Sequence, residues 1–151
     1  MNNSGKTRFD WTRYITLSED LLNQMKADEE DLARCGISRA YYGAFHLVVV
    51  YMKKNDLYRD VVGEGSHQTV IKDCISYGSS SNREAGKLWK TIGEKLKRRL
   101  YECRKKADYK ECYFPAMIPP TACMKDELKK AVCYAKEVQD NVVLLEEAEA
   151  S

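Results

Sequence analysis

The sequence has few of the residues from which metal centres and disulfide frameworks are built. Only two histidines, His46 and His67, occur among its 151 residues. There are six cysteines, but none forms a C-x-x-C pair or lies at ligand spacing from a histidine. A ferritin-like metal bundle needs Glu-x-x-His on each of two helices, and His46 has no glutamate three residues before it. We therefore expect reduced thiols that pack as small apolar side chains, and neither a metal nor another cofactor.

Long apolar segments are also missing. The longest strongly apolar run, residues 44–52, is far shorter than the about 20 residues of a membrane-spanning helix. Residues 1–9 are polar and lack the apolar centre of a signal peptide. We therefore expect a soluble, cytoplasmic protein with no membrane contact. A chain of this length with 44% hydrophobic residues can bury one sizeable core. This predicts a single domain over residues 1–151, with an ordered core at about residues 10–147 and polar termini.

No period-two run bounded by turn residues occurs, and apolar residues recur at helical spacing along nearly the whole chain. The pattern predicts long helices that begin near residues 10, 29, 82 and 121, and a short helix at residues 67–77. Asp10 and Ser66 are the expected N-caps, the third long helix is expected to begin at Asn82, and Cys103 is expected on its inner side. The predicted fold is all-α, an up-and-down four-helix bundle with an additional short helix.

Two residues within the second long helix suit phosphodiester chemistry. Arg39 and His46 are seven residues apart, which is almost two turns, so their side chains leave from one face. A guanidinium keeps its charge and can hold a phosphate, whereas an imidazole titrates near neutral pH and can move a proton. Tyr42 lies one turn from each and could hydrogen-bond into this face. Gly43 is unfavourable in a helix interior by about 1 kcal/mol, which indicates a close backbone approach, for instance across a dimer contact.

Positive charge is concentrated in one part of the chain. The net charge is +2, yet residues 83–110 hold eleven Lys or Arg and four Asp or Glu, a local net charge of +7. Such a segment favours contact with a phosphate backbone, beside which Tyr101, Tyr109 and Tyr113 could stack on bases. A solvated helix face or an acidic partner protein would also explain the charge. The residues expected to contact nucleic acid are Lys95, Arg98, Arg99, Lys105 and Lys106.

Three separated elements resemble the HEPN superfamily, in particular its small stand-alone prokaryotic members. They are the run SRAYYGAFH at residues 38–46, the H-x-x-V at residues 67–70, and LYECRKKADY at residues 100–109. The family pattern is R-x(4–6)-H, commonly RxAYYAxFH, then H-x-x-V at the start of a short helix, then L-x-x-x-R-x-x-ADY. The matching residues are Arg39, Tyr41, Tyr42, Phe45, His46, His67, Val70, Leu100, Arg104, Ala107, Asp108 and Tyr109.

The resemblance implies a HEPN-like bundle that forms a homodimer through the helix bearing Arg39 and His46, so that two chains line one cleft. RNase members of the family cleave RNA without metal, and attack by the 2′-hydroxyl leaves a 2′,3′-cyclic phosphate and a 5′-hydroxyl. His46 would then transfer protons, and Arg39 would stabilise charge on the phosphate. Supporting roles would fall to Ser38, Tyr42, Arg104 and Asp108. The last two would form a salt bridge to a neighbouring helix, and His67 would cap or order the short helix.

Many HEPN proteins of this size form half of a toxin–antitoxin or defence pair, so a nucleotidyltransferase antitoxin is a candidate partner. Active RNase members usually have a polar residue directly after the arginine, where this chain has Ala40. A second class of function therefore stays open beside the endoribonuclease. It is a noncatalytic HEPN module that binds nucleic acid or nucleotide, or that pairs with a nucleotidyltransferase.

Overall fold

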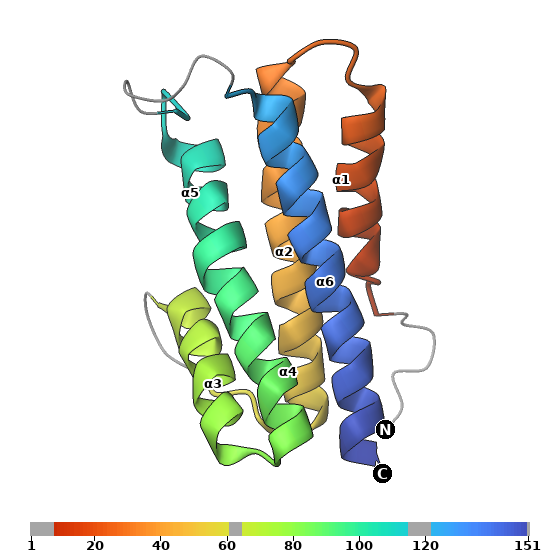
Figure 1. Ribbon diagram of the computed structural model, residues 1–151, viewed down its shortest axis with the longest axis vertical. Helices are drawn as coiled ribbons and strands as arrows, with labels where there is room; N and C mark the ends of the chain where they lie inside the picture. The colour runs from red at the N-terminus through yellow and green to blue at the C-terminus, as the bar shows by residue number, and fades with distance from the viewer. Residues whose placement is uncertain (1–7, 61–64, 115–121, 151) are drawn as a thin grey trace.

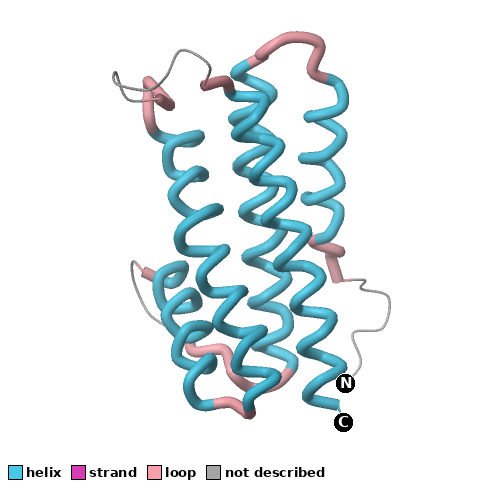
Figure 2. Tube along the Cα trace, viewed as in Figure 1, coloured by secondary structure: helices cyan, strands magenta, loops and turns pink. Residues whose placement is uncertain are grey.

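The computed structural model describes residues 8–60, 65–114 and 122–150, and helices are its only regular elements there (Figure 2). The all-α prediction is confirmed for these residues. Among them, no helix is both long and apolar enough to cross a bilayer. The elements are α1 (Thr12–Gln24), α2 (Glu30–Lys54), α3 (Ser66–Ser80), α4 (Arg83–Glu94), the π-helical segment η1 (Lys95–Tyr101), α5 (Glu102–Tyr109) and α6 (Met124–Ala150).

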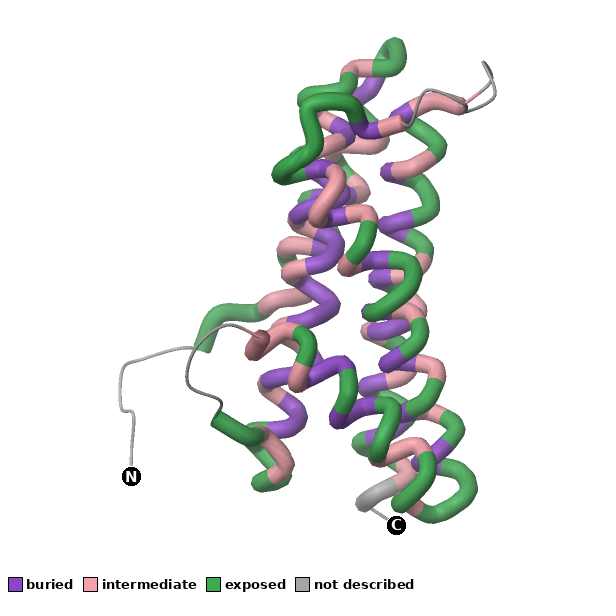
Figure 3. The backbone as a smooth tube through the Cα atoms, turned by 90° about the vertical axis from the view of Figure 1, so that its left-hand side faces the viewer, coloured by how far each residue is buried: buried purple, intermediate pink, exposed green. Residues whose placement is uncertain are grey.

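The long helices run alternately up and down the molecule (Figure 1). α1 leads up to a loop from which α2 returns, α4, η1 and α5 continue one another as a single rod, and α6 runs back beside that rod. The shorter α3 lies along the lower half of the rod (Figure 1). Buried and exposed residues alternate along each helix (Figure 3), as expected for amphipathic helices around one shared core.

The close approach predicted at Gly43 occurs within one chain. A Cβ atom at Gly43 would lie 2.8 Å from Cγ1 of Ile15 and 3.1 Å from the carbonyl oxygen of Trp11, both near the start of α1. The small residue therefore lets α1 pack directly onto α2. A dimer contact is not needed to explain this glycine, and that part of the expectation is corrected.

Two of the predicted caps differ in detail from the structure. Asn82, where the third long helix was expected to begin, is the N-cap of α4, and its side chain accepts a 2.9 Å hydrogen bond from the Ala85 amide. Asp10 accepts from the Thr12 amide at 3.0 Å, but it stands one residue before the N-cap position of α1. Ser66 is the first residue of α3 and makes no capping bond, because Gly65, with a φ of 106°, turns the chain into the helix.

Two helix boundaries also depart from the sequence pattern. α3 continues to Ser80, beyond the predicted end at residue 77. The predicted start of the last helix at residue 121 lies outside the described residues. At the start of α6, the Met124 and Lys125 amides donate to the Asp28 carboxylate at 3.1 and 2.7 Å. A side chain from the loop between α1 and α2 therefore satisfies two of the free amides at the start of α6.

The rod formed by α4, η1 and α5 buries a residue that apolar periodicity in the sequence does not select. Its inner positions are Ile92, Leu96, Leu100 and Arg104, each four residues after the last. In an α-helix each such step overshoots a full turn by about 40°. The wider turns of η1 absorb this drift and keep the positions on one side. Arg104 is thus buried, with 6% of its surface exposed, and the half-buried Cys103 packs against the core, as predicted.

The cysteines are all free, and the prediction that they pack as apolar side chains holds for Cys74 and Cys103, which pack in or against the core. The Cys74 thiol is buried within α3, and burial raises its pKa. Cys103 and Cys123 are half-buried, while Cys35, Cys112 and Cys133 are exposed. Where the structure describes the chain, no cluster of His, Cys, Asp or Glu could hold a metal ion.

Candidate functional site

One stripe of α2 is left uncovered by the other helices. Its residues recur at steps of three or four and are half-buried or exposed, which places them on one helical face. We call this set the outer stripe. It consists of Cys35, Arg39, Tyr42, His46, Val50 and Lys53.

Aromatic residues at the start of α1 border the outer stripe on one side. The ring of His46 stacks on Trp11, with ring centroids 3.9 Å apart and planes 19° apart. The guanidinium of Arg39 lies 5.2 Å from the centre of the Tyr14 ring, and Trp11 and Tyr14 meet edge to face at 5.2 Å. These contacts fix both side chains predicted to act on phosphate.

The surroundings of His46 favour its neutral form. Partial burial is the main cause that lowers the pKa of His46, and the positive charge of Lys53 lowers it further. An uncharged imidazole at neutral pH can accept a proton, so His46 is suited to act as a general base.

A buried cation borders the other side of the outer stripe. The guanidinium carbon of Arg104 lies 5.1 to 5.7 Å from the centres of four tyrosine rings, and its Nε is buried without a hydrogen-bond partner. We call this arrangement the Arg104 cage. Cation–π contacts compensate part of the cost of burying the charge. Its rings are those of Tyr41, Tyr42, Tyr101 and Tyr109.

The predicted salt bridge between Arg104 and Asp108 is present but lies within one helix, at 3.8 Å. The connection to a neighbouring helix is made instead by Ser38, whose hydroxyl donates to the Asp108 carboxylate at 3.3 Å. Ser38 and Asp108 therefore join α2 to α5 beside the outer stripe. At 3.8 Å the carboxylate neutralises the buried guanidinium only in part.

His67 joins the site, whereas the sequence suggested only a role in ordering the short helix. Its Nδ1 lies 2.6 Å from the Tyr41 hydroxyl, and its ring stacks on Phe45 at 4.3 Å. Burial is the main cause that lowers the pKa of His67, and the charges of Arg104 and His46 add to it. Burial raises the pKa of Tyr41, which keeps the phenol protonated. We expect the neutral ring to carry its proton on Nε2, so that the phenol donates to Nδ1.

The two histidines approach the same pair of rings. Phe45 lies 5.3 Å from His46 and 4.3 Å from His67, and Tyr42 lies 6.2 and 6.1 Å from them. The structure thus gathers residues 38–46, 67–70 and 100–109 around one face. Among the described residues the Tyr42 hydroxyl makes no hydrogen bond, so the predicted bond is not formed. Ala40 is fully buried and points into the core, away from this face.

The basic residues predicted to contact nucleic acid do not form one surface. Lys95 and Arg99 turn toward Tyr134 of α6, at 4.8 and 5.6 Å from the ring centre. Lys106 lies 5.0 Å from the centre of the Tyr113 ring. Arg98 and Lys105 line a groove beside α3.

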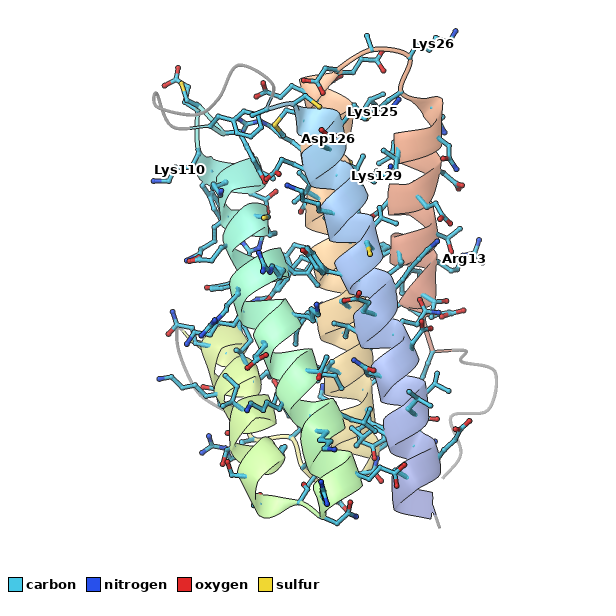
Figure 4. All side chains as sticks on the ribbon, in the orientation of Figure 1. Arg13, Lys26, Lys110, Lys125, Asp126 and Lys129 are labelled. Atoms are coloured by element: carbon cyan, nitrogen blue, oxygen red, sulfur yellow. The ribbon has the colours of Figure 1, made fainter. Side chains whose placement is uncertain are left out.

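Other charged residues lie at the periphery of the bundle. Arg13 and Lys110 extend from opposite sides of it (Figure 4).

Several residues of the site carry no local signal in the sequence. Trp11 and Tyr14 belong to the apolar stripe of α1, and only the packing allowed by Gly43 brings them to Arg39 and His46. No protein-family model matches the chain, and no curated protein or solved structure compared with it matches either. The chemistry of this face must therefore be argued from its residues. It combines two guanidiniums with two neutral imidazoles, a set that can hold an anion and move protons.

Proposed function

We propose that this chain is a HEPN-like protein that cleaves RNA without a metal ion. The observation that carries the proposal is the shared position of Arg39 and His46 on the outer stripe, where His46 is held neutral. In the proposed reaction the 2′-hydroxyl attacks the adjacent phosphorus. The products are a 2′,3′-cyclic phosphate and a 5′-hydroxyl. DNA lacks this nucleophile and is not a substrate.

His46 takes the proton of the attacking hydroxyl, and Arg39 stabilises the charge that grows on the non-bridging oxygens. Protonation of the leaving 5′-oxygen needs a second group, which the His46 of a second copy supplies. The outer stripe supports this dimer, because it is the face of α2 that the other helices leave uncovered and that can therefore meet a second copy.

The biological setting rests on the resemblance alone. It is a cytoplasmic toxin–antitoxin or defence pair, in which a nucleotidyltransferase acts as the antitoxin. The partner would cover the outer stripe or the dimer cleft and so block RNA.

A noncatalytic module that binds nucleic acid or nucleotide is the second candidate, and one observation favours it. Trp11 covers a face of the His46 ring at 3.9 Å, which restricts how a phosphate can reach the imidazole. Such a protein would bind RNA through Arg39 and its neighbours without cutting it.

The test is cleavage of mixed cellular RNA by purified protein in excess chelator. We expect Arg39→Ala and His46→Ala each to lower the rate by about 100-fold or more, the range of an acid–base group. Arg13→Ala serves as the matched control, because it removes a cation from the outside of α1 (Figure 4). It should cut like the wild type, and the ends should be cyclic phosphates. Equal activity of all folded variants would contradict the proposal, and RNA binding without cleavage would favour the noncatalytic module.

A further inference from the structure

A groove of about 310 Å³ opens between α3 and the rod formed by η1 and α5. In Figure 1, α3 lies along the lower half of the rod that α4, η1 and α5 form. The groove has an apolar floor and a cationic rim. The floor is formed by Ile71, Ile75 and Tyr101, and the rim by Gln68, Lys72, Lys97, Arg98, Glu102 and Lys105.

The charges of the rim are unbalanced. Among the described residues, Glu102 is the only carboxylate that lines the groove, and it pairs with Lys105 at 2.8 Å. Within the described part of the chain, no ion pair neutralises Lys72, Lys97 or Arg98. Three cations therefore face a groove whose own carboxylate is already engaged, which favours an anionic occupant.

The floor selects among anions. Ile75 has 37% of its surface exposed, so the apolar floor is open to solvent. Tyr101 offers an aromatic surface beside Ile71. A flat apolar floor next to cations suits a nucleobase whose flanking phosphates reach the rim. The volume lies at the lower end of ligand sites, about 300–1,000 Å³, so few bases can be held at once.

The groove is also connected to the proposed reaction site. Tyr101 belongs to the Arg104 cage, and its ring lies 6.1 Å from that of His67. Gln68, the next residue after His67, lines the groove. A strand that lies in the groove would therefore pass beside His67 toward the outer stripe.

We infer that the groove between α3 and η1–α5 binds single-stranded RNA, with a base on the floor and phosphates on Lys72, Lys97 and Arg98. This inference rests on the proposed function for its substrate class and adds the place where the strand is held. Of these residues, only Arg98 was expected from the sequence to contact nucleic acid.

The experiment measures binding of a labelled, unstructured RNA eight-mer to the full chain carrying His46→Ala, which prevents cleavage in the proposed reaction. The groove variant is Lys97→Glu with Arg98→Glu. The matched control is Arg83→Glu with Lys87→Glu, two exposed cations on the same rod that do not line the groove. Folding of each variant is verified by circular dichroism. A second ligand has the same phosphates but no bases.

We expect the groove variant to weaken binding by about tenfold or more and to reduce the slope of log affinity against log salt by about 1.4, since each phosphate contact with a single strand contributes about 0.7. The control variant should weaken binding by no more than about threefold. Loss of the bases should weaken binding to the His46→Ala chain by about fivefold or more, the lower end of base stacking.

Equal losses in the groove and control variants would overturn the inference, because binding would then follow overall charge. Equal affinity for the ligand without bases would overturn the role of the floor. Absence of RNA binding would overturn it as well and leave an acidic protein as the occupant. If the wild type cleaves RNA and the groove variant binds RNA as tightly as the His46→Ala chain, the inference about the groove fails and the proposed cleavage stands. If the groove variant loses RNA binding but the wild type does not cleave RNA, the proposed catalysis fails and the inference about the groove stands.

Discussion

The hydrogen bond between Tyr41 and His67 can be tested by removing a single oxygen atom. Tyr41 is fully buried, and its hydroxyl lies 2.6 Å from Nδ1 of His67. Tyr41→Phe keeps the ring but leaves a partly buried acceptor without a donor. An unsatisfied buried acceptor costs about 1–3 kcal/mol. Because His67 is only half-buried, water can replace part of the bond, and we expect a loss of about 1–2 kcal/mol in the free energy of unfolding.

The loss is measured by equilibrium denaturant unfolding, and it corresponds to about 2–4 °C in Tm for each kcal/mol in a chain of this size. Tyr42→Phe is the matched control. It lies on the same helix, and its hydroxyl has no hydrogen bond within the described ranges, so its effect should stay within about 0.5 kcal/mol. NMR of the imidazole nitrogens gives a second measurement. The wild type should carry the His67 proton on Nε2, and Tyr41→Phe should allow both tautomers.

The reasoning fails if Tyr41→Phe unfolds at the same denaturant concentration as Tyr42→Phe and the tautomer of His67 does not change. Tyr41 would then act only as a packing residue. A proton on Nδ1 of His67 in the wild type would also refute the assigned direction of the bond, because the phenol could not then donate to Nδ1.

The pKa values of both His46 and His67 are lowered in the folded chain, so the unfolded chain binds protons first as the pH falls below their ordinary value of 6.5. The free energy of unfolding should therefore decrease from neutral pH toward about pH 5. His46→Gln should make this decrease shallower. An unchanged slope of the free energy of unfolding against pH would contradict the burial of the His46 ring. Gly43→Ala should destabilise the fold by about 1 kcal/mol, since overpacking against α1 costs about 1–3 kcal/mol and the better helix propensity returns at most about 1 kcal/mol; thermal unfolding measures this, and a more stable variant would argue against the close packing. Asp28→Ala should cost about 1 kcal/mol by leaving the start of α6 uncapped, whereas Lys26→Ala in the same loop should have little effect; equal unfolding midpoints of the two variants would show that the cap contributes nothing.

The helices could be predicted because their signals lie within a few residues. Asn82 caps α4 by accepting a hydrogen bond from the amide three positions later. The spacing of apolar residues predicts each long helix. The π-helical turn within the rod was not predicted, because apolar periodicity alone suggests an α-helix throughout. Leu96 and Leu100 recur every four residues, and this repeat, continued to Arg104, fits a wider turn. The period of four was present in the sequence, but by itself it does not distinguish a π-helical turn from an α-helix that rotates its buried face.

The site could be predicted only where it lies on one helix. The shared face of Arg39 and His46 follows from their spacing on α2. The contacts of Trp11 with His46 and of His67 with Tyr41 depend on the packing of different helices, and no spacing rule connects residues so far apart. The sequence gives the positions of the polar and aromatic residues of the site along the chain, but it does not reveal which of them are neighbours in space.

The charge of the site explains why the proposed reaction needs a second copy. His46 and His67 both favour the neutral form, and the high pKa of Tyr41 makes its phenol a poor acid at neutral pH. One chain therefore offers bases but no ready acid. A bound phosphate changes this balance, because its negative charge favours protonation of a nearby imidazole. Two copies of His46 that share one phosphate would then titrate as a coupled pair, one protonated as the acid and one neutral as the base. The pH profile of cleavage should accordingly be bell-shaped, and a mixed dimer in which one chain carries His46→Ala should lose activity as fully as the double variant.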